Sequence, residues 1–295
     1  MRKWIIGALL LLLVTAAGLK IYAAKTEADL IHQVSLDEMR REERQEARKK
    51  EAAKKIPPKE IKKEMPQAAA ETPAEKASEA QPQGPAGTGP IVAIDAGHQA
   101  HGNPEKETIA PSSNQMKAKV ADGTRGVATG IGEYEFNLNF SRCLKQKLES
   151  AGYRVVMIRD SNDVNLSNQE RAAIANASGA EVYLRIHANG GPKAVAGIET
   201  YYPSKNNPDV GHLSDASMRL SELILSEMAA ATSAKPRGAI ARDDLTGTNF
   251  AQMPTSLIEC GYMSNPEEDK KLNDPSYQEA MAIGILRALD RYFKS

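Results

Sequence analysis

The sequence has 295 residues, which is enough for one large domain or two small ones. Lysine and arginine together number 38, as do aspartate and glutamate, so the formal net charge is zero. This balance and an aromatic content of only 5% give no support for a nucleic-acid partner, which usually requires a basic excess or a stacking surface.

The first predicted element is residues 1–24, a signal peptide or signal anchor. A basic pair, Arg2 and Lys3, precedes the apolar run 4–19, which is the pattern of a secretory signal or of an uncleaved anchor. The run is slightly shorter than the ~20 residues that span a bilayer, although Lys20 can extend it by snorkelling. Both alternatives stay open, and both place the rest of the chain outside the cytoplasmic membrane.

Residues 25–66 are predicted to form a charged, partly helical stalk. Within it, residues 36–66 are dense in both charges and nearly free of large apolar residues, and local acid–base pairs favour a solvated rod that breaks at Pro57 and Pro58. Residues 67–90 are rich in Ala, Pro, Gln, Gly and Glu and are predicted to be a disordered linker. The simplest role of both segments is that of a spacer, which would hold a domain away from the membrane. The alternative is that the charged rod binds a partner.

Residues 91–295 have the sequence pattern of one folded domain, in which short apolar runs alternate with amphipathic helical segments. This alternation predicts an α/β fold around a mostly parallel sheet. Such sheets bind ligands beyond the carboxyl ends of their strands. Strands are expected at 91–95, 153–160, 181–188, 197–203 and 255–261, and helices at 132–151, 167–178, 212–232 and 275–293.

Polar residues occur where these strands end. His98 follows the first strand, His187 lies in the third and Glu259 in the last, while Glu133 stands at the start of a helix. Two histidines and a glutamate can supply the three protein ligands of a catalytic zinc. A second carboxylate, Glu259, would then transfer the proton from water to the leaving group. Widely separated ligands are by themselves a weak signal.

At these residues the sequence resembles one family, the zinc-dependent N-acetylmuramoyl-L-alanine amidases of the type 3 group. Four motifs appear in the family's order within residues 90–295. They are a D-x-G-H turn at 95–98, a helix opened by Glu133 with Asn137 and Leu138 following, an I-H-A-N segment at 186–189, and E-x-G-[FY]-x-S-N at 259–265.

The resemblance implies a single catalytic domain with a twisted, mostly parallel six-stranded sheet flanked by helices. It implies one Zn²⁺ held by His98, Glu133 and His187, with Glu259 as the catalytic glutamate. The implied reaction is hydrolysis of the amide bond between N-acetylmuramic acid and L-alanine, and the implied partner is peptidoglycan. The enzyme would be extracytoplasmic, anchored in the membrane by the uncleaved N-terminal segment or secreted to the cell wall. A protein activator or regulator is an open expectation.

Two features depart from the family pattern. Residues 99–131 form a long polar loop that can cover the site, shape the groove or regulate access. Arg185 stands where relatives often have a smaller residue, and it either contacts substrate carboxylates or pairs with an acid on the sheet. Asp95 either orients a zinc ligand or caps its turn. The role of Asn189 is open, and His101 is a weak rival ligand in the variable loop.

Several plainer interpretations accompany these assignments. Glu135 rivals Glu133, but residues two apart on a helix do not share a face, and the family register selects Glu133. Cys143 and Cys260 are expected to be buried thiols, with one disulfide bridge as the alternative, and Cys260 should point away from the face that carries Glu259. The rival functions are a non-catalytic wall-binding or regulatory protein and a zinc peptidase that cuts within the stem peptide.

Overall fold

The structure is a computed structural model, and it describes residues 88–294. The predicted signal or anchor at 1–24, the stalk at 25–66 and nearly all of the linker at 67–90 lie outside the described residues. Within the described part, none of the helices combines the length and the apolar character needed to cross a bilayer.

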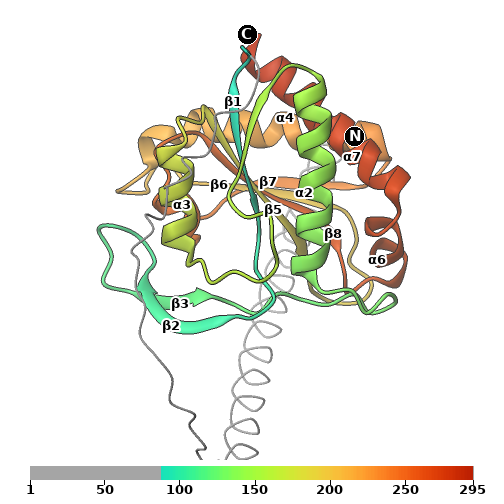
Figure 1. The fold of residues 1–295 in the computed structure, drawn as a ribbon, viewed down its shortest axis with the longest axis horizontal. Coiled ribbons are helices and arrows are strands. Elements are labelled where there is room, and N and C mark those ends of the chain that lie inside the picture. Colours follow the sequence, from blue (N-terminus) through green and yellow to red (C-terminus); the bar gives the residue numbers. More distant parts are fainter. Residues whose placement is uncertain (1–87, 295) are drawn as a thin grey trace, which may run out of the picture. The chain divides into compact units, whose positions relative to one another are not determined.

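A six-stranded sheet in the order β4-β1-β5-β8-β6-β7 forms the centre of the domain (Figure 1). Four neighbouring strands run parallel, while β6 pairs antiparallel with β8 and parallel with β7. The expected α/β fold with a mostly parallel sheet is therefore confirmed. The strands are β1 (Ile91–Ala96), β4 (Arg154–Met157), β5 (Val182–Asn189), β6 (Ile198–Tyr202), β7 (Pro236–Ala241) and β8 (Thr255–Tyr262).

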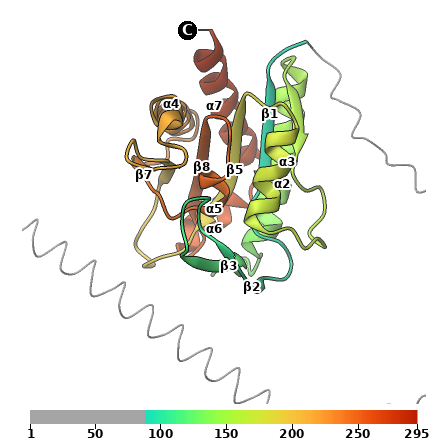
Figure 2. The ribbon, with the colours of Figure 1, turned by 90° about the vertical axis from the view of Figure 1, so that its left-hand side faces the viewer.

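Helices cover both faces of the sheet (Figures 1 and 2). One face packs against α2, α4 and α7 in the main hydrophobic core, and the other packs against α3 and α5 in a smaller one. The central strands are largely apolar because both faces are covered, and their charged residues, such as Asp95, Arg185 and Glu259, are the exceptions. The helices are α2 (Glu133–Ser150), α3 (Asn168–Ala177), α4 (Ser214–Thr232), α5 (Thr246–Asn249), α6 (Pro266–Leu272) and α7 (Pro275–Phe293), with a 3₁₀ turn at Gly211–Leu213.

Helix α2 shows how the sequence pattern fixes an element. Phe136, Phe140, Leu144 and Leu148 recur every four residues and are fully buried against the sheet. This spacing places them on one face of a helix, and truncating either phenylalanine to alanine would cost about 3–5 kcal/mol. Gly152 has a φ of 91° and lies just past the helix end, where a residue in the left-handed conformation lets backbone N–H groups pair with the last carbonyl groups of the helix.

The segment 99–131, expected to be a long polar loop, is polar but contains regular structure. This segment contains an antiparallel hairpin of β2 (Asn103–Thr108) and β3 (Met116–Val120), which lies at the end of the sheet where β1 finishes (Figure 1). Its strands are polar because they pack through hydrogen bonds rather than through an apolar face. Glu107 accepts the backbone N–H groups of Asn168 and Gln169 at the start of α3, which fixes the hairpin to that helix.

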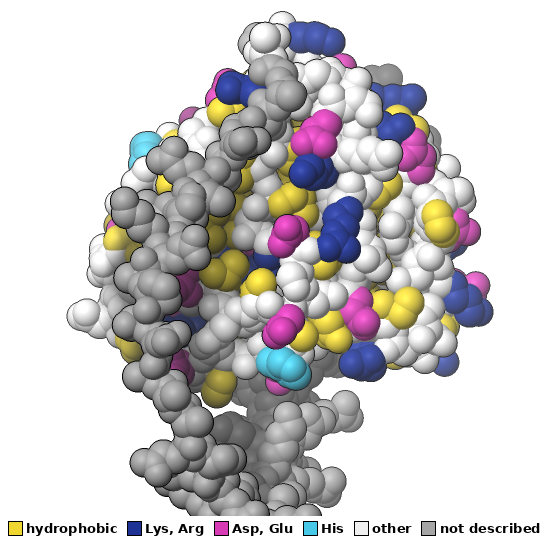
Figure 3. Space-filling view, in the orientation of Figure 1, with side chains coloured by type: hydrophobic (Ala, Val, Ile, Leu, Met, Phe, Trp, Pro, Cys, Tyr) yellow, Lys and Arg dark blue, Asp and Glu magenta, His cyan; other side chains and the backbone are white. Residues whose placement is uncertain are grey.

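Two further elements were not predicted from the sequence pattern. Strand β7 is the sixth strand, and it begins with a proline and lies at the sheet edge, where a missing N–H is tolerated. Helix α6 begins at an Asn265 cap followed by proline, which is a start signal in a segment assigned no element. Figure 3 shows acidic and basic side chains interspersed on the face seen in Figure 1.

The two cysteines are free thiols. Cys260 is buried in the main hydrophobic core, and Cys143 is half-buried with its Sγ 3.9 Å from an oxygen of Glu279. Because Cys260 packs against the helices while its neighbour Glu259 belongs to the opposite face of β8, it contributes packing, as expected from the alternation along a strand.

Candidate metal centre and active site

The three candidate ligands His98, Glu133 and His187 come together at one end of the sheet. One ligand-capable atom from each lies within 4.8 Å of the other two. His98 follows β1, His187 lies near the end of the neighbouring parallel strand β5, and Glu133 is the first residue of α2. The site is therefore assembled at the carboxyl ends of adjacent parallel strands, where open α/β sheets bind ligands.

His98 is held in an uncommon backbone conformation. Its φ is 59°, in the left-handed region that non-glycine residues rarely adopt. Arg171 Nη2 donates to its carbonyl oxygen at 2.8 Å, and its own Nδ1 donates to the Ala121 carbonyl at 2.9 Å. The preceding Gly97 allows the close approach, since a Cβ there would lie 2.3 Å from the His187 ring.

The Glu133 carboxylate joins the two histidines. Its Oε1 lies 3.2 Å from His98 Nε2 and 3.1 Å from His187 Nδ1, and its Oε2 accepts the Thr124 N–H at 2.9 Å. Burial alone would raise the pKa of Glu133, but the two rings outweigh it and hold this pKa well below its usual range. Glu135, the rival, accepts the Gly132 N–H instead and closes a capping box.

The contacts of these side chains fit a cation between them. Because His98 Nδ1 donates to a carbonyl, a neutral His98 ring would turn the lone pair of Nε2 toward Glu133 Oε1. Two facing lone pairs repel, so the arrangement requires a second proton on His98 or a metal ion. In the protein without metal, burial lowers the pKa of His98. The nearby Glu133 carboxylate has the larger opposite effect, so the pKa of His98 is raised overall.

His187 completes a donor set suited to a metal. Burial lowers the pKa of His187 to about 4, so its ring is neutral at pH 7 and keeps a lone pair. Its Nε2 is buried and has no hydrogen-bond partner among residues 88–294. Two imidazoles and one carboxylate are the ligands that catalytic zinc commonly takes from a protein.

Glu259 lies beside this centre on the same face of the sheet. It pairs with His187 across β5 and β8 and with Glu199 across β8 and β6. Its Oε2 is buried and lacks any hydrogen-bond partner in the described part of the chain. Burial, followed by the charges of Glu133 and Glu199, raises the pKa of Glu259 well above its usual value. Glu259 is thus a half-buried residue with one buried carboxylate oxygen that is unpaired within residues 88–294.

Glu199 is a site neighbour that the sequence analysis missed. Its carboxylate accepts hydrogen bonds from Tyr201 Oη at 2.6 Å, Tyr262 Oη at 2.8 Å and Arg237 Nε at 2.6 Å. It is 7% exposed. In the sequence, the only hint of this role was a glutamate within the apolar run 197–203. Because burying a carboxylate without partners is unfavourable, a glutamate in such a run is expected to have hydrogen-bond partners.

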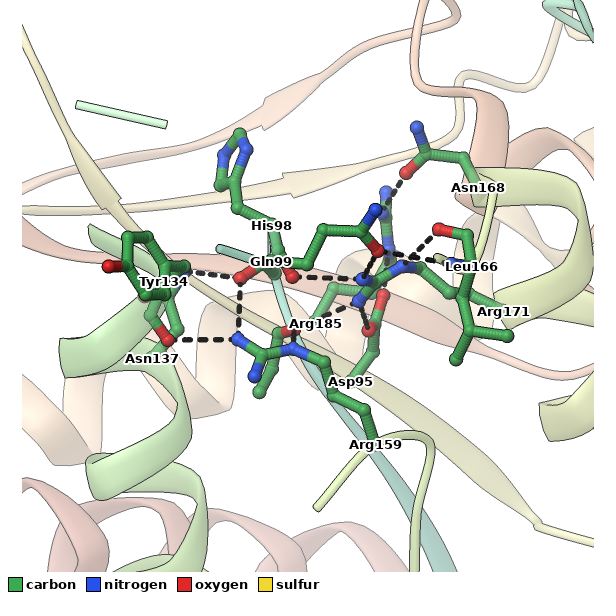
Figure 4. Close-up of polar contacts among 12 residues, drawn as sticks. Asp95, His98, Gln99, Tyr134, Asn137, Arg159, Leu166, Asn168, Arg171 and Arg185 are labelled. Atoms are coloured by element: carbon green, nitrogen blue, oxygen red, sulfur yellow. Dashed lines mark hydrogen bonds and ion pairs between the residues drawn. The ribbon is translucent and has the colours of Figure 1, made fainter. Parts of the chain in front are cut away.

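Asp95 is the centre of a buried ionic network under the metal site (Figure 4). Its carboxylate accepts hydrogen bonds from Arg171 at 2.7 Å, Tyr183 at 3.1 Å and Arg185 at 3.3 Å. Arg185 therefore pairs with an acid on the sheet, the plainer of its two predicted roles. Asp95 acts on His98 through Arg171, which donates to both residues, so neither predicted role of Asp95 describes its contacts fully.

Of the remaining candidates, Asn189 and His101 do not belong to the cluster of ligand atoms, whereas Asn137 contacts it. Asn189 Oδ1 accepts the N–H of Gly190, which is a local backbone contact. His101 is exposed and does not belong to the cluster of ligand atoms. Asn137, quoted in the motif without a role, donates from Nδ2 to the Gly97 carbonyl at 3.0 Å and lies 3.4 Å from Glu133 Oε1. It therefore links the two segments that present His98 and Glu133.

The sequence and the fold match known proteins. The family model described as N-acetylmuramoyl-L-alanine amidase matches residues 92–291. The N-acetylmuramoyl-L-alanine amidase Rv3717 of Mycobacterium tuberculosis is 28% identical over 75% of this chain and 92% of its own length. The uncharacterized protein YqiI of Bacillus subtilis is 31% identical over 57% of this chain and 77% of its own length.

A solved structure shows the same likeness. The crystal structure of the N-acetylmuramyl-L-alanine amidase Ami1 from Mycobacterium smegmatis superposes with a TM-score of 0.63 and 26% sequence identity. The superposition covers 70% of this chain and 97% of that chain. The matched portion therefore corresponds to nearly all of the solved domain.

Proposed function

The chain belongs to the N-acetylmuramoyl-L-alanine amidase family, and from that premise we propose that it is a zinc-dependent hydrolase with Glu259 as its general base and acid. It is a peptidoglycan amidase that hydrolyses the bond between N-acetylmuramic acid and L-alanine. In the proposal, His98, Glu133 and His187 hold the metal. The observation that carries the proposal is the meeting of three ligand-capable atoms within 4.8 Å, beside a buried Glu259 oxygen with no partner among the described residues.

A zinc ion bound there would act as a Lewis acid that polarises the scissile carbonyl and lowers the pKa of water. Glu259 accepts the proton of the attacking water and returns it to the alanine nitrogen as that bond breaks. Arg171, anchored by Asp95, holds the His98 carbonyl and so orients the His98 ring. Thr124 and Asn137 orient the Glu133 carboxylate.

Digestion of purified peptidoglycan by the purified chain, with zinc and after chelation, tests this proposal. Mass spectrometry should detect free stem peptides that begin with L-alanine, and only when metal is present. Fragments cut within the peptide would indicate the rival zinc peptidase. An intact wall in both samples, with zinc bound to a folded protein, would favour the non-catalytic wall-binding rival.

We also propose that the enzyme acts outside the cytoplasmic membrane. Residues 1–24 would anchor it or direct its secretion, and residues 25–66 with the linker 67–90 would give the catalytic domain reach into the wall. This proposal rests on the sequence pattern of the N-terminal segment and on the location of the substrate. Fractionation of cells into membrane, wall and medium, with the size of the mature chain measured, separates anchor from cleaved signal.

A further inference from the structure

The segment that leads into α2 passes beside α6 and surrounds the proposed ligand Glu133 (Figure 1). The N–H of Glu133 donates to the Thr124 carbonyl at 2.9 Å, and the N–H of Thr124 donates to Glu133 Oε2 at 2.9 Å. A Cβ at Gly123 would lie 2.9 Å from Glu133 Oε2 and 3.1 Å from the His98 ring. The position of this segment therefore determines where the Glu133 carboxylate lies.

Residues 124–132 form a turn that is closed by its own backbone. The N–H of Gly126 donates to the Ile131 carbonyl at 2.9 Å, and Arg125 pairs with Gly132 in an isolated antiparallel bridge. These contacts join the two legs of the turn. A displacement at its tip is therefore transmitted to its base, which holds the carboxylate of the proposed ligand.

The tip of turn 124–132 has almost no apolar anchor. Residues 127–130 are all exposed, and Val127, the one large apolar side chain among them, is 59% exposed. An exposed segment of this kind opens easily unless polar contacts hold it. The N–H of Val127 donates to the Met263 carbonyl at 3.1 Å, which is one such contact.

Asp269 of α6 supplies the other contacts. Its side chain is fully buried, and its Oδ2 accepts the N–H groups of Ala128 at 2.7 Å and Thr129 at 2.8 Å. Its Oδ1 accepts the Thr129 hydroxyl at 2.8 Å and the Asn273 amide at 3.3 Å. These donors are all uncharged. Since a buried carboxylate is unfavourable unless hydrogen bonds satisfy it, the turn and this carboxylate stabilise each other.

Gly126 shows how closely the turn and the carboxylate approach. A Cβ at Gly126 would lie 2.1 Å from Asp269 Oδ1 and 2.5 Å from Thr129 Oγ1. A residue without a Cβ is therefore required for the carboxylate to reach the tip. The contact depends on a residue of the turn as well as on a residue of α6.

We propose that Asp269 is a positioning residue for the metal centre, because it fixes the tip of turn 124–132 and the base of that turn holds Glu133 in the orientation that binds the metal. Asp269 acts through the turn and not by contact with the metal or the substrate. Groups that orient a ligand contribute to metal affinity in this way. This inference rests on the proposed function.

Zinc affinity, measured by competition with a chelator, tests the inference. Asp269→Ala removes the acceptor of two backbone N–H groups, so the zinc Kd should rise about tenfold. Asp269→Asn keeps one oxygen that can accept both groups, so its Kd should stay within about threefold of the wild type. Glu267→Gln, an exposed residue of the same helix that pairs with Lys270, is the matched control. A wild-type Kd in Asp269→Ala would overturn the inference.

A second variant disturbs the same contact from the side of the turn. Gly126→Ala should push the carboxylate away from the tip and raise the zinc Kd as much as Asp269→Ala does. The double variant should raise it no further, because both changes remove one shared contact. Fully additive effects would contradict this account of the contact.

A core variant separates positioning from a general loss of stability. Leu289 of α7 is fully buried in the main hydrophobic core. Leu289→Ala should lower the thermal midpoint of unfolding at least as much as Asp269→Ala, yet leave the zinc Kd unchanged. An equal rise of Kd in both variants would show that Asp269 acts only through global stability.

Hydrogen exchange of the metal-free protein provides a readout that requires no zinc. Asp269→Ala should speed the exchange of amides in residues 123–135 and leave that of β1 and β5 unchanged. Unchanged exchange in the turn would overturn the inference. If the wild-type protein binds no zinc, the proposed metal centre fails, and hydrogen exchange still decides whether Asp269 fixes the turn.

Discussion

Glu199 and Glu259 lie directly opposite each other on β6 and β8, yet their surroundings differ. Glu199 accepts hydrogen bonds from two tyrosines and one arginine, whereas Glu259 Oε2 is buried with no partner among the described residues. The two facing carboxylates therefore differ, because both Glu199 oxygens accept hydrogen bonds and one Glu259 oxygen has no partner in the described part of the chain. The proposed mechanism depends on this difference.

Replacing the proposed general base should separate metal binding from turnover. Glu259→Gln keeps the size of the side chain but cannot accept the proton of water, so we expect a loss of at least about 100-fold in kcat. Its zinc content, measured by mass spectrometry of the metal, should equal that of the wild type. Cleavage at the wild-type rate would exclude Glu259 as the base.

Removing a proposed ligand, unlike replacing the proposed base, should abolish zinc binding as well as activity. His187→Ala removes one of three protein donors, so zinc should be lost on dialysis and activity with it. His101→Ala is the matched control, because His101 is exposed and outside the cluster of ligand atoms. Full zinc content in the His187 variant would remove that residue from the site.

The charge of Glu199 should be visible in the pH dependence of catalysis. After burial and Glu133, Glu199 is the next cause that raises the pKa of Glu259. Glu199→Gln removes this negative charge, so the pKa of Glu259 should fall and the rising limb of kcat/KM should move to lower pH. Glu105→Gln, an exposed pair with Lys119, serves as the control. An unmoved or upward-shifted limb would refute the assigned coupling.

The network around Asp95 should matter for stability. Its pKa lies well below the usual range because Arg171 and Arg185 outweigh the effect of burial. Asp95→Asn leaves two buried guanidinium groups without their carboxylate, and we expect a loss of about 3 kcal/mol or more in the free energy of unfolding. Urea denaturation measures this loss, and Glu267→Gln, which breaks an exposed pair with Lys270, should cost much less.

The same network predicts how acid affects the fold. A carboxyl whose pKa is depressed on folding contributes stability that is present above its unfolded pKa of about 3.9 and is lost as the pH falls through the folded pKa. The Asp95→Asn variant should therefore lose less stability than the wild type between about pH 5 and pH 2. Parallel curves for the two proteins would show that Asp95 is not the group responsible.

The sequence predicted those elements whose side chains follow a regular pattern. The apolar spacing of α2 and the largely apolar runs of β1, β5 and β8 are such patterns. Polar residues near the strand ends, together with the four family motifs, then pointed to His98, Glu133, His187 and Glu259. The hairpin and β7 carry no such pattern, since they are held by hydrogen bonds to distant residues and by the sheet edge. Glu199 and Arg171 were missed for the same reason, because their roles depend on partners far apart in the chain.

The most direct measurement is an anomalous difference map at the zinc absorption edge from a crystal grown with zinc. We predict a single strong peak within about 2.0–2.2 Å of one atom each of His98, Glu133 and His187, with Glu259 close by but not coordinated. No peak at these residues, or a peak ligated by Glu259 in place of one of them, would contradict the assignment of the metal and of the base.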